Sequence, residues 1–150
     1  MRVERQFSVF LENKPGRLLQ ICSALAKEKV SLDALAVVDS RDHSVLRFVV
    51  DKPEAAQAAL EKLGVPFQES DVCVVEIKNQ VGSMASMCER LASEKINIDY
   101  LYSSSGSRNG KTIVILKATP VEKVRQVLAE GAPIKPTRAP LRRAPVRKAP

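Results

Sequence analysis

The 150-residue chain is poor in the residue types that most metal and catalytic sites use. It has no Trp, one His and three Cys, and no two Cys form a Cys-x-x-Cys pair. This pattern argues against a disulfide framework or a zinc site, and it predicts reduced thiols and a cytoplasmic location. The sequence also lacks a Gly-x-Ser-x-Gly, a P-loop and a His-Glu-x-x-His motif. We therefore expect no metal, no cofactor and no enzymatic activity.

Long apolar segments are also lacking. No apolar run approaches the roughly 18 residues that a membrane span requires, and residues 1–5 (MRVER) do not begin a signal peptide. We expect no contact with membranes. The apolar content of 45% nevertheless suffices for a core, and the length suits one domain or two very small ones.

Acidic residues are absent from the last twenty positions. Residues 131–150 hold six basic residues and five of the nine Pro. The other 130 residues carry 18 basic and 17 acidic groups, so the net charge of +7 belongs mainly to this segment. Because such a composition buries too little apolar surface to repay ordering, we predict a disordered, basic, Pro-rich tail over residues 135–150.

The chain contains an internal repeat. Shifting the sequence by 66 residues places residues 13–35 on residues 79–101, and nine of these 23 positions are identical. The identical pairs are Asn13/Asn79, Gly16/Gly82, Cys22/Cys88, Leu25/Leu91, Ala26/Ala92, Glu28/Glu94, Lys29/Lys95, Asp33/Asp99 and Leu35/Leu101. The period is too long, and two copies are too few, for a solenoid. The repeat therefore predicts two small domains.

Each copy shows the same succession of local patterns. Apolar residues alternate over 7–11 and 73–77, which predicts a strand with one buried face. They then recur at helical spacing, which predicts a helix with one apolar stripe. The stripe residues are Leu18, Ile21, Cys22 and Leu25 in the first copy and Met84, Met87, Cys88 and Leu91 in the second. Second strands over about 30–38 and 96–104, polar hairpin turns, and third strands over 45–50 and 112–116 follow.

A second helix and a last strand complete each copy. Pro53 and Pro120 suit helix starts, and Gly64 and Gly131 suit helix ends. A last strand is expected over residues 65–70, whereas Pro136 leaves the second copy a very short edge strand or none. The predicted fold class is α+β, with two tandem ferredoxin-like βαββαβ units. We expect the first over residues 1–70 and the second over residues 71–134.

The reactive side chains have ordinary structural explanations. His43 lies in a polar hairpin turn and is expected at the surface. Cys22 and Cys88 occupy equivalent places on helix stripes, where Cys acts as a small buried hydrophobe. Cys73 replaces the strand position of Phe7 and is expected to pack in the core. No nucleophile is accompanied by a base.

One face of each predicted sheet has no helix to cover it. In the first unit Phe10, Ala36, Val38 and Val49 would leave apolar area exposed on this face. We therefore expect the two units to pair within the chain, and the chain to form a homodimer.

The turn between the first strand and first helix is polar, contains Gly and occurs twice. It reads ENKPGR over 12–17 and KNQVGS over 78–83. A helix N-terminus favours carboxylates and phosphates, and Gly16 and Gly82 let a ligand approach the main chain. Asn13 and Asn79 offer a donor and an acceptor, which suits an amino acid. The alternative is that Asn is an N-cap or turn residue and that Gly only shapes the bend.

These turns and the segments after their helices resemble the ACT domain family of small-molecule-binding regulatory modules. In the first copy the residues are NKPGRL (13–18) and VSLD (30–33), and in the second NQVGSM (79–84) and INI (96–98). The resemblance covers about residues 5–131. It indicates two tandem ACT domains, as in stand-alone ACT proteins that carry no enzyme domain.

The resemblance implies that an amino acid binds at interfaces between paired ACT domains. Asn13 and Asn79 match the Asn that contacts the ligand, and Asn97 matches the Asn of the family's Asn-Ile segment. The turn that holds the carboxylate corresponds to Lys14, Pro15, Gly16, Arg17 and Leu18 in the first copy and to Gln80, Val81, Gly82, Ser83 and Met84 in the second. The first copy has Ser31 in place of the Asn-Ile Asn, and the second has Val81 in place of the turn Pro.

Two other functions are compatible with parts of the sequence. Residues 7–50 also resemble the ACT module of the acetolactate synthase small subunit, which implies a regulatory subunit of an enzyme of amino-acid biosynthesis. RNA-recognition modules share the topology but need aromatic side chains on central strands, and the third strands offer only Phe48. The basic tail either contacts phosphates non-specifically or is a solubilising extension. Nucleic-acid binding is therefore disfavoured.

Overall fold

The computed structural model describes residues 1–39, 43–105 and 110–129, which form two similar units. The elements in chain order are β1 (Arg2–Glu12), α1 (Arg17–Lys27), β2 (Leu32–Asp39), β3 (His43–Val50), α2 (Pro53–Leu63), β4 (Phe67–Lys78), α3 (Ser83–Ser93), β5 (Ile98–Ser105), β6 (Lys111–Ala118) and α4 (Val121–Ala129). We call the elements from β1 to α2 the first unit and those from α3 to α4 the second unit. The strand β4 belongs to both. The predicted helix end at Gly131, the short last strand and the tail lie outside the described residues.

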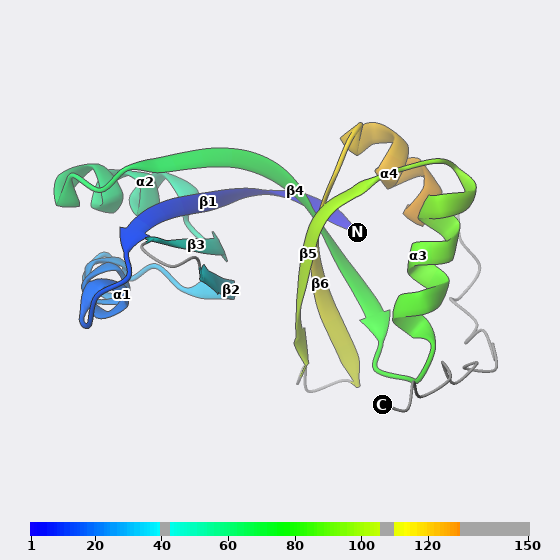
Figure 1. Ribbon diagram of the computed structural model, residues 1–150, viewed down its shortest axis with the longest axis horizontal. Helices are drawn as coiled ribbons and strands as arrows, with labels where there is room; N and C mark the ends of the chain where they lie inside the picture. The colour runs from blue at the N-terminus through cyan, green and yellow to red at the C-terminus, as the bar shows by residue number, and fades with distance from the viewer. Residues whose placement is uncertain (40–42, 106–109, 130–150) are drawn as a thin grey trace, which may run out of the picture.

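All the strands join one antiparallel sheet in the order β2-β3-β1-β4-β6-β5. The predicted α+β fold with tandem βαββαβ units is confirmed. The last strand expected over 65–70 is present from Phe67, although it is not separate from the strand that follows. It continues into the next strand, so that β4 crosses the expected boundary between residues 70 and 71 without a break. Residues 67–78 contain no Gly, Pro or Asn, and Ser70 and Asp71 at the boundary stay in the ladder because they pair with Gln6 and Arg5 of β1. The ribbons of β1 and β4 connect the two units (Figure 1).

Each unit buries a core between its helices and one face of the sheet. In the first unit, Phe7 and Phe48 stack with ring centroids 5.5 Å apart and are fully buried. In the second, Cys73 and Val114 occupy the positions 66 residues later and are also fully buried. The repeat thus preserves the position of the core while its aromatic side chains are replaced. The predicted packing role of Cys73 is confirmed.

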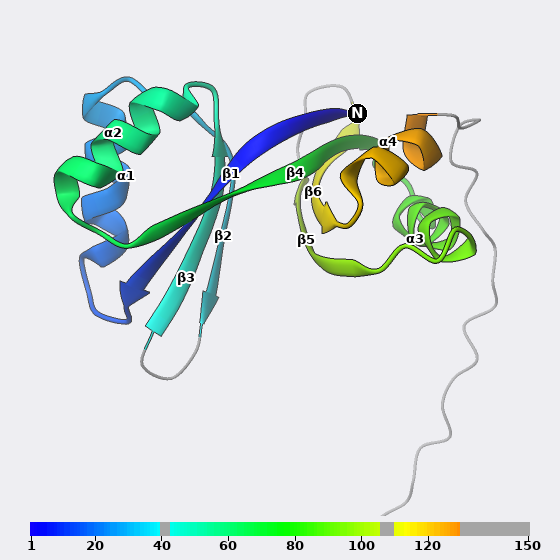
Figure 2. The same ribbon diagram turned by 90° about the horizontal axis from the view of Figure 1, so that it is seen from above.

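The helix-free faces of the two units face each other. Figure 2 shows α1 and α2 on one side of the molecule, α3 and α4 on the other, and the strands between them. A third apolar cluster joins the units; it consists of Ala34, Val49, Val72, Val74 and Ile115, with Tyr102 and Ile113 packed against it. The predicted pairing of the units within the chain is therefore confirmed. It buries Val49 but leaves Phe10 and Val38 exposed.

The helix boundaries follow the predicted signals where they can be seen. Pro53 lies in the first turn of α2, and Gly64 ends that helix with a left-handed φ of 67°. Two predictions on α1 and α3 need correction. Leu18, placed on the buried stripe, is 41% exposed because it lies in the first turn of α1, and Cys22 and Cys88 are only half-buried. His43 is exposed as expected, but it is the first residue of β3.

Candidate functional site

The two strand–helix turns have nearly the same backbone. Gly16 has φ 85° and ψ −11°, and Gly82 has φ 88° and ψ −10°. Both occupy the N-cap position of the helix that follows. This left-handed conformation costs a residue with a Cβ about 1–2 kcal/mol, so the backbone itself favours glycine at both positions. The space above Gly16 is open, since a Cβ built there meets no atom within 4 Å.

The hydrogen bonds inside the two turns also correspond. The N–H of Lys14 donates to Glu12 O at 2.8 Å, and that of Gln80 donates to Lys78 O at 2.9 Å. The N–H of Arg17 donates to Lys14 O at 3.4 Å, as that of Ser83 donates to Gln80 O at 3.2 Å. The predicted carboxylate donors at 17 and 83 are thus engaged within the turn.

The next backbone donors remain available. The N–H groups of Leu18 and Leu19, and those of Met84 and Ala85, donate to no backbone carbonyl in the part of the chain that the structure describes. First-turn N–H groups lack an intrahelical acceptor and carry the positive end of the helix dipole. Each turn therefore presents two adjacent donors suited to an anionic group.

The N-cap explanation of the two Asn residues is wrong. Gly16 and Gly82 hold the N-cap positions, and within the described residues neither N-cap has a side-chain hydrogen bond. Asn13 and Asn79 lie three residues earlier, at exposed positions. The N–H of Asn79 donates to Gly110 O at 2.8 Å. This bond connects the backbone of the second turn to the residue that precedes β6.

The two turns differ in their side chains. In the first, Glu12 accepts from Lys14 Nζ at 2.9 Å and from Arg17 at 3.2 Å, and these bonds lower the pKa of the Glu12 carboxyl. This ionised cluster has one more positive than negative charge and is exposed. In the second turn, Ser83 is buried and its Oγ has no hydrogen-bond partner among the described residues. Val81, which replaces Pro15, is 96% exposed.

Asn97 does not lie with the turn of its own unit. It follows the C-terminal end of α3, where its side-chain amide donates to Asp99 Oδ1 at 3.3 Å, whereas Gly82 lies at the N-terminal end. Eleven helical residues separate these ends by about 16 Å. Ser31 has the equivalent place after α1, and its N–H donates to Asp51 Oδ1 at 2.8 Å. One unit alone therefore does not bring the predicted residues together.

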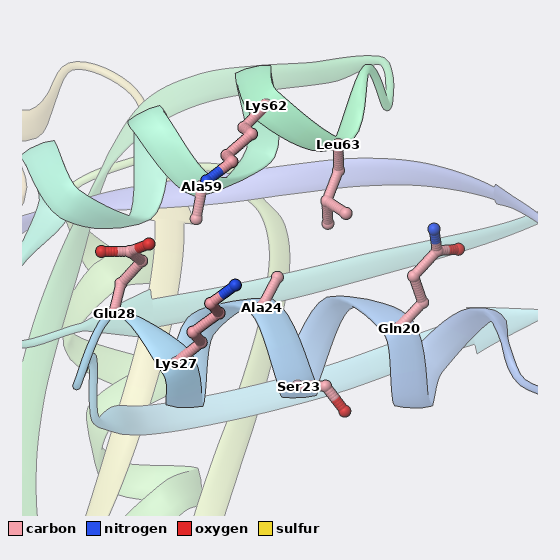
Figure 3. A pocket seen from close by; sticks show the side chains of 8 residues that line it. All are labelled: Gln20, Ser23, Ala24, Lys27, Glu28, Ala59, Lys62 and Leu63. Atoms are coloured by element: carbon pink, nitrogen blue, oxygen red, sulfur yellow. The ribbon is translucent and has the colours of Figure 1, made fainter.

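The described surface also has a groove between α1 and α2 that the sequence did not signal. Its volume is about 410 Å³, and it is lined by Gln20, Ser23, Ala24, Lys27, Glu28, Ala59, Lys62 and Leu63. Figure 3 shows Gln20 and Ala24 of α1 and Ala59 and Leu63 of α2 pointing toward one another. A similar groove of about 330 Å³ lies between α3 and α4. Neither groove includes a residue of the predicted turns.

A polar cluster around the buried Gln6 side chain lies between the two units, and the sequence did not indicate it. Gln6 is fully buried; its Nε2 donates to Tyr100 Oη at 2.6 Å, and its Oε1 accepts from Tyr102 Oη at 3.1 Å. The Arg47 guanidinium lies 4.2 Å from the centre of the Tyr100 ring. Burial raises the pKa of Tyr102, so its hydroxyl stays protonated and donates. We call Gln6, Arg47, Tyr100 and Tyr102 the inter-unit cluster.

The described residues give no support for a metal site or a membrane span. Within residues 1–39, 43–105 and 110–129, no three His, Cys, Asp or Glu side chains gather into a group able to hold a metal ion. None of the helices in these ranges has the length and hydropathy needed to cross a bilayer.

Comparison with known proteins decides the family. A family model described as an ACT domain pair matches residues 1–132. The chain belongs to the ACT domain pair family. The expected membership is thus confirmed over nearly all of the chain outside its basic tail. No curated protein matches this ACT domain pair.

Solved structures agree with this assignment. The ACT domain pair is 34% identical to protein BT0572 from Bacteroides thetaiotaomicron, with a TM-score of 0.79, over 85% of this chain and 88% of that one. It shares its fold with the regulatory subunits of aspartate kinase from Thermus thermophilus and Thermus flavus. The Thermus thermophilus subunit is 20% identical, with a TM-score of 0.66, over 85% of this chain and 91% of that one. The Thermus flavus subunit is 21% identical, with a TM-score of 0.65, over 85% of this chain and 88% of that one.

Proposed function

We propose that this ACT domain pair is a non-catalytic regulatory protein that binds an amino acid at its strand–helix turns. The observation that carries the proposal is the duplicated turn, in which a left-handed glycine caps the helix and two backbone N–H groups donate to no backbone carbonyl of the described chain. Two turns of unlike sequence have kept the same backbone, which supports a shared role.

The chemistry of an amino acid suits this arrangement. Its carboxylate would accept hydrogen bonds from the N–H groups of Leu18 and Leu19 in the first turn, or of Met84 and Ala85 in the second. The Asn13 or Asn79 side-chain carbonyl would accept from its ammonium group. The buried, unpaired Oγ of Ser83 supports a polar ligand in the second turn.

The distance between each turn and its own Asn97 or Ser31 supports binding between two units. A ligand that contacts a turn and also Ser31 or Asn97 must take the Ser31 or Asn97 from a second ACT unit. The β2 or β5 edge of that second unit would then lie beside the turn. A homodimer would supply that unit. We therefore place the proposed ligand at an interface between two copies of the chain.

Replacing Asn13 or Asn79 with Ala tests the proposal. We expect the affinity for the amino acid to fall roughly ten- to a hundred-fold at the working turn, because a hydrogen bond to a charged group contributes about 1.5–3 kcal/mol. A thermal-shift screen of the twenty amino acids would first select the ligand, and saturating ligand at about 100 times its dissociation constant should add about 2.7 kcal/mol to stability. Calorimetry would then measure its affinity for each variant.

Gln126→Ala is the matched control, since Gln126 is exposed on α4 and remote from both turns. Its affinity should equal that of the parent. Unaltered binding in the double Asn13→Ala/Asn79→Ala variant would refute the proposed site. So would a screen in which no amino acid binds the parent at millimolar concentration. Co-purification of a large catalytic subunit would favour the second candidate function, a regulatory subunit of an amino-acid biosynthetic enzyme.

A further inference from the structure

The groove between α1 and α2, which we call the first groove, has an apolar floor. The floor consists of Ala24 on α1 and of Ala59 and Leu63 on α2. Ala59 is buried, and Ala24 and Leu63 are half-buried. Along α1 the first groove extends from Gln20 to Lys27, a rise of about 10 Å in an α-helix. With a volume of about 410 Å³, it has the size of a site for a small organic molecule.

Two lysines reach over this floor from opposite helices. Figure 3 shows Lys27 of α1 extending toward α2, and Lys62 of α2 extending toward α1. Within the described residues neither ammonium group has an ion pair or a hydrogen bond. Glu28 also lines the first groove, beside Lys27 and at the end opposite Gln20 (Figure 3). The lining therefore holds two positive charges and one negative charge, a balance that is complementary to a single negative charge.

The groove between α3 and α4 shows how the two units differ. Arg90 stands 66 residues after Ala24, and its guanidinium donates to the Val127 carbonyl across that second groove. Lys123 donates to Glu94 O at 2.6 Å, and its ammonium group lies 3.7 Å from the Glu94 carboxylate. The cations of the second groove are thus bonded within the protein, whereas the lysines of the first groove are available to a ligand.

We propose that the first groove binds a small organic acid with one carboxylate and an unbranched apolar chain. The carboxylate accepts charge-assisted hydrogen bonds from the ammonium groups of Lys27 and Lys62. The chain lies on Ala24 and extends toward Leu63, where it covers apolar surface.

The shape and charge of the first groove restrict this ligand. An extended chain suits a groove that follows α1 for about 10 Å. Glu28 lies at the end where the lysines reach over the floor, so it repels a second negative charge there and disfavours dicarboxylates and phosphates. The site shares no residue with the strand–helix turns, and it does not depend on the proposed function.

Calorimetry on the full chain tests the site with octanoate as the probe. We expect one octanoate to bind the parent with a Kd of about 1 mM or below. Octylamine has the same chain with the opposite charge and should not bind. Acetate has the same carboxylate without the chain, and its affinity should be lower by about ten-fold or more.

The variant Lys27→Gln/Lys62→Gln locates the binding, and Lys29→Gln/Lys95→Gln is its matched control. Both variants remove two exposed lysines, but Lys29 and Lys95 line neither groove. We expect the first variant to bind octanoate about ten-fold more weakly or not at all, because it loses both charged donors. The control should bind as the parent does. Both should keep the far-ultraviolet dichroism spectrum of the parent.

Several results would overturn the inference. They are a parent that does not bind octanoate at millimolar concentration, undiminished binding in Lys27→Gln/Lys62→Gln, an equal loss in the control, and equal affinity for octylamine. An acidic amphipathic peptide that binds the parent where octanoate does not would make the first groove a protein-docking surface and also overturn it. Octanoate binding in a parent that binds no amino acid would refute the proposed function and leave this site standing.

Discussion

Replacing Gln6 with Leu is expected to lower the free energy of unfolding by roughly 2–4 kcal/mol, although the two side chains have similar size. The Gln6 amide is the hydrogen-bond partner of both Tyr100 and Tyr102 across the boundary between the units. An apolar side chain would leave two tyrosine hydroxyls without this partner. A fully buried unsatisfied group costs about 1–3 kcal/mol, and because both tyrosines are partly buried the lower part of that range applies to each. Urea denaturation followed by circular dichroism would measure the change.

Two variants make this prediction specific to the inter-unit cluster. Ser8→Ala removes only the peripheral acceptor, 3.4 Å from Gln6 Nε2, and should change stability by less than about 0.5 kcal/mol. The triple variant Gln6→Leu/Tyr100→Phe/Tyr102→Phe removes both tyrosine hydroxyls that Gln6→Leu leaves without a partner, and it should recover most of the loss. A Gln6→Leu protein as stable as the parent would show that the cluster contributes nothing to holding the units together.

Replacing Phe48 with Ala should lower the free energy of unfolding by about 3–5 kcal/mol. Phe48 is fully buried, stacks on Phe7 with an interplanar angle of 23°, and belongs to the core beneath α1 and α2. Truncation removes the ring and leaves a cavity that the surrounding β-strands cannot close. Thermal and urea unfolding would both report the effect.

Leu19→Ala is the control for Phe48→Ala. Leu19 is 68% exposed on α1, and its truncation should change stability by no more than about 0.5 kcal/mol. Equal losses in the two variants would contradict the described core. So would a Phe48→Ala protein that unfolds at the temperature of the parent.

The sequence alone determined the local elements and their order. Alternating apolar residues around Phe7 and helical spacing around Leu25 are short-range patterns, and the chain folds each into the element that buries its apolar side. Pro53 and Gly64 act through their own backbone preferences, so the ends of α2 were predictable. The 66-residue repeat then supplied the second unit. The backbone conformation of Gly16 and Gly82 followed from the same local chemistry.

Only the tertiary structure decided how the two units meet. The continuity of β4, the partners of Gln6, and the separation of Asn97 from Gly82 each depend on residues distant in the chain. Gln6 appears in the sequence as an ordinary polar residue between Arg5 and the core residue Phe7. It becomes the centre of a buried cluster because the sheet folds back and brings β5 over β1. No pattern along one strand encodes the partner that another strand will bring, and such contacts are fixed only when all the strands pack together.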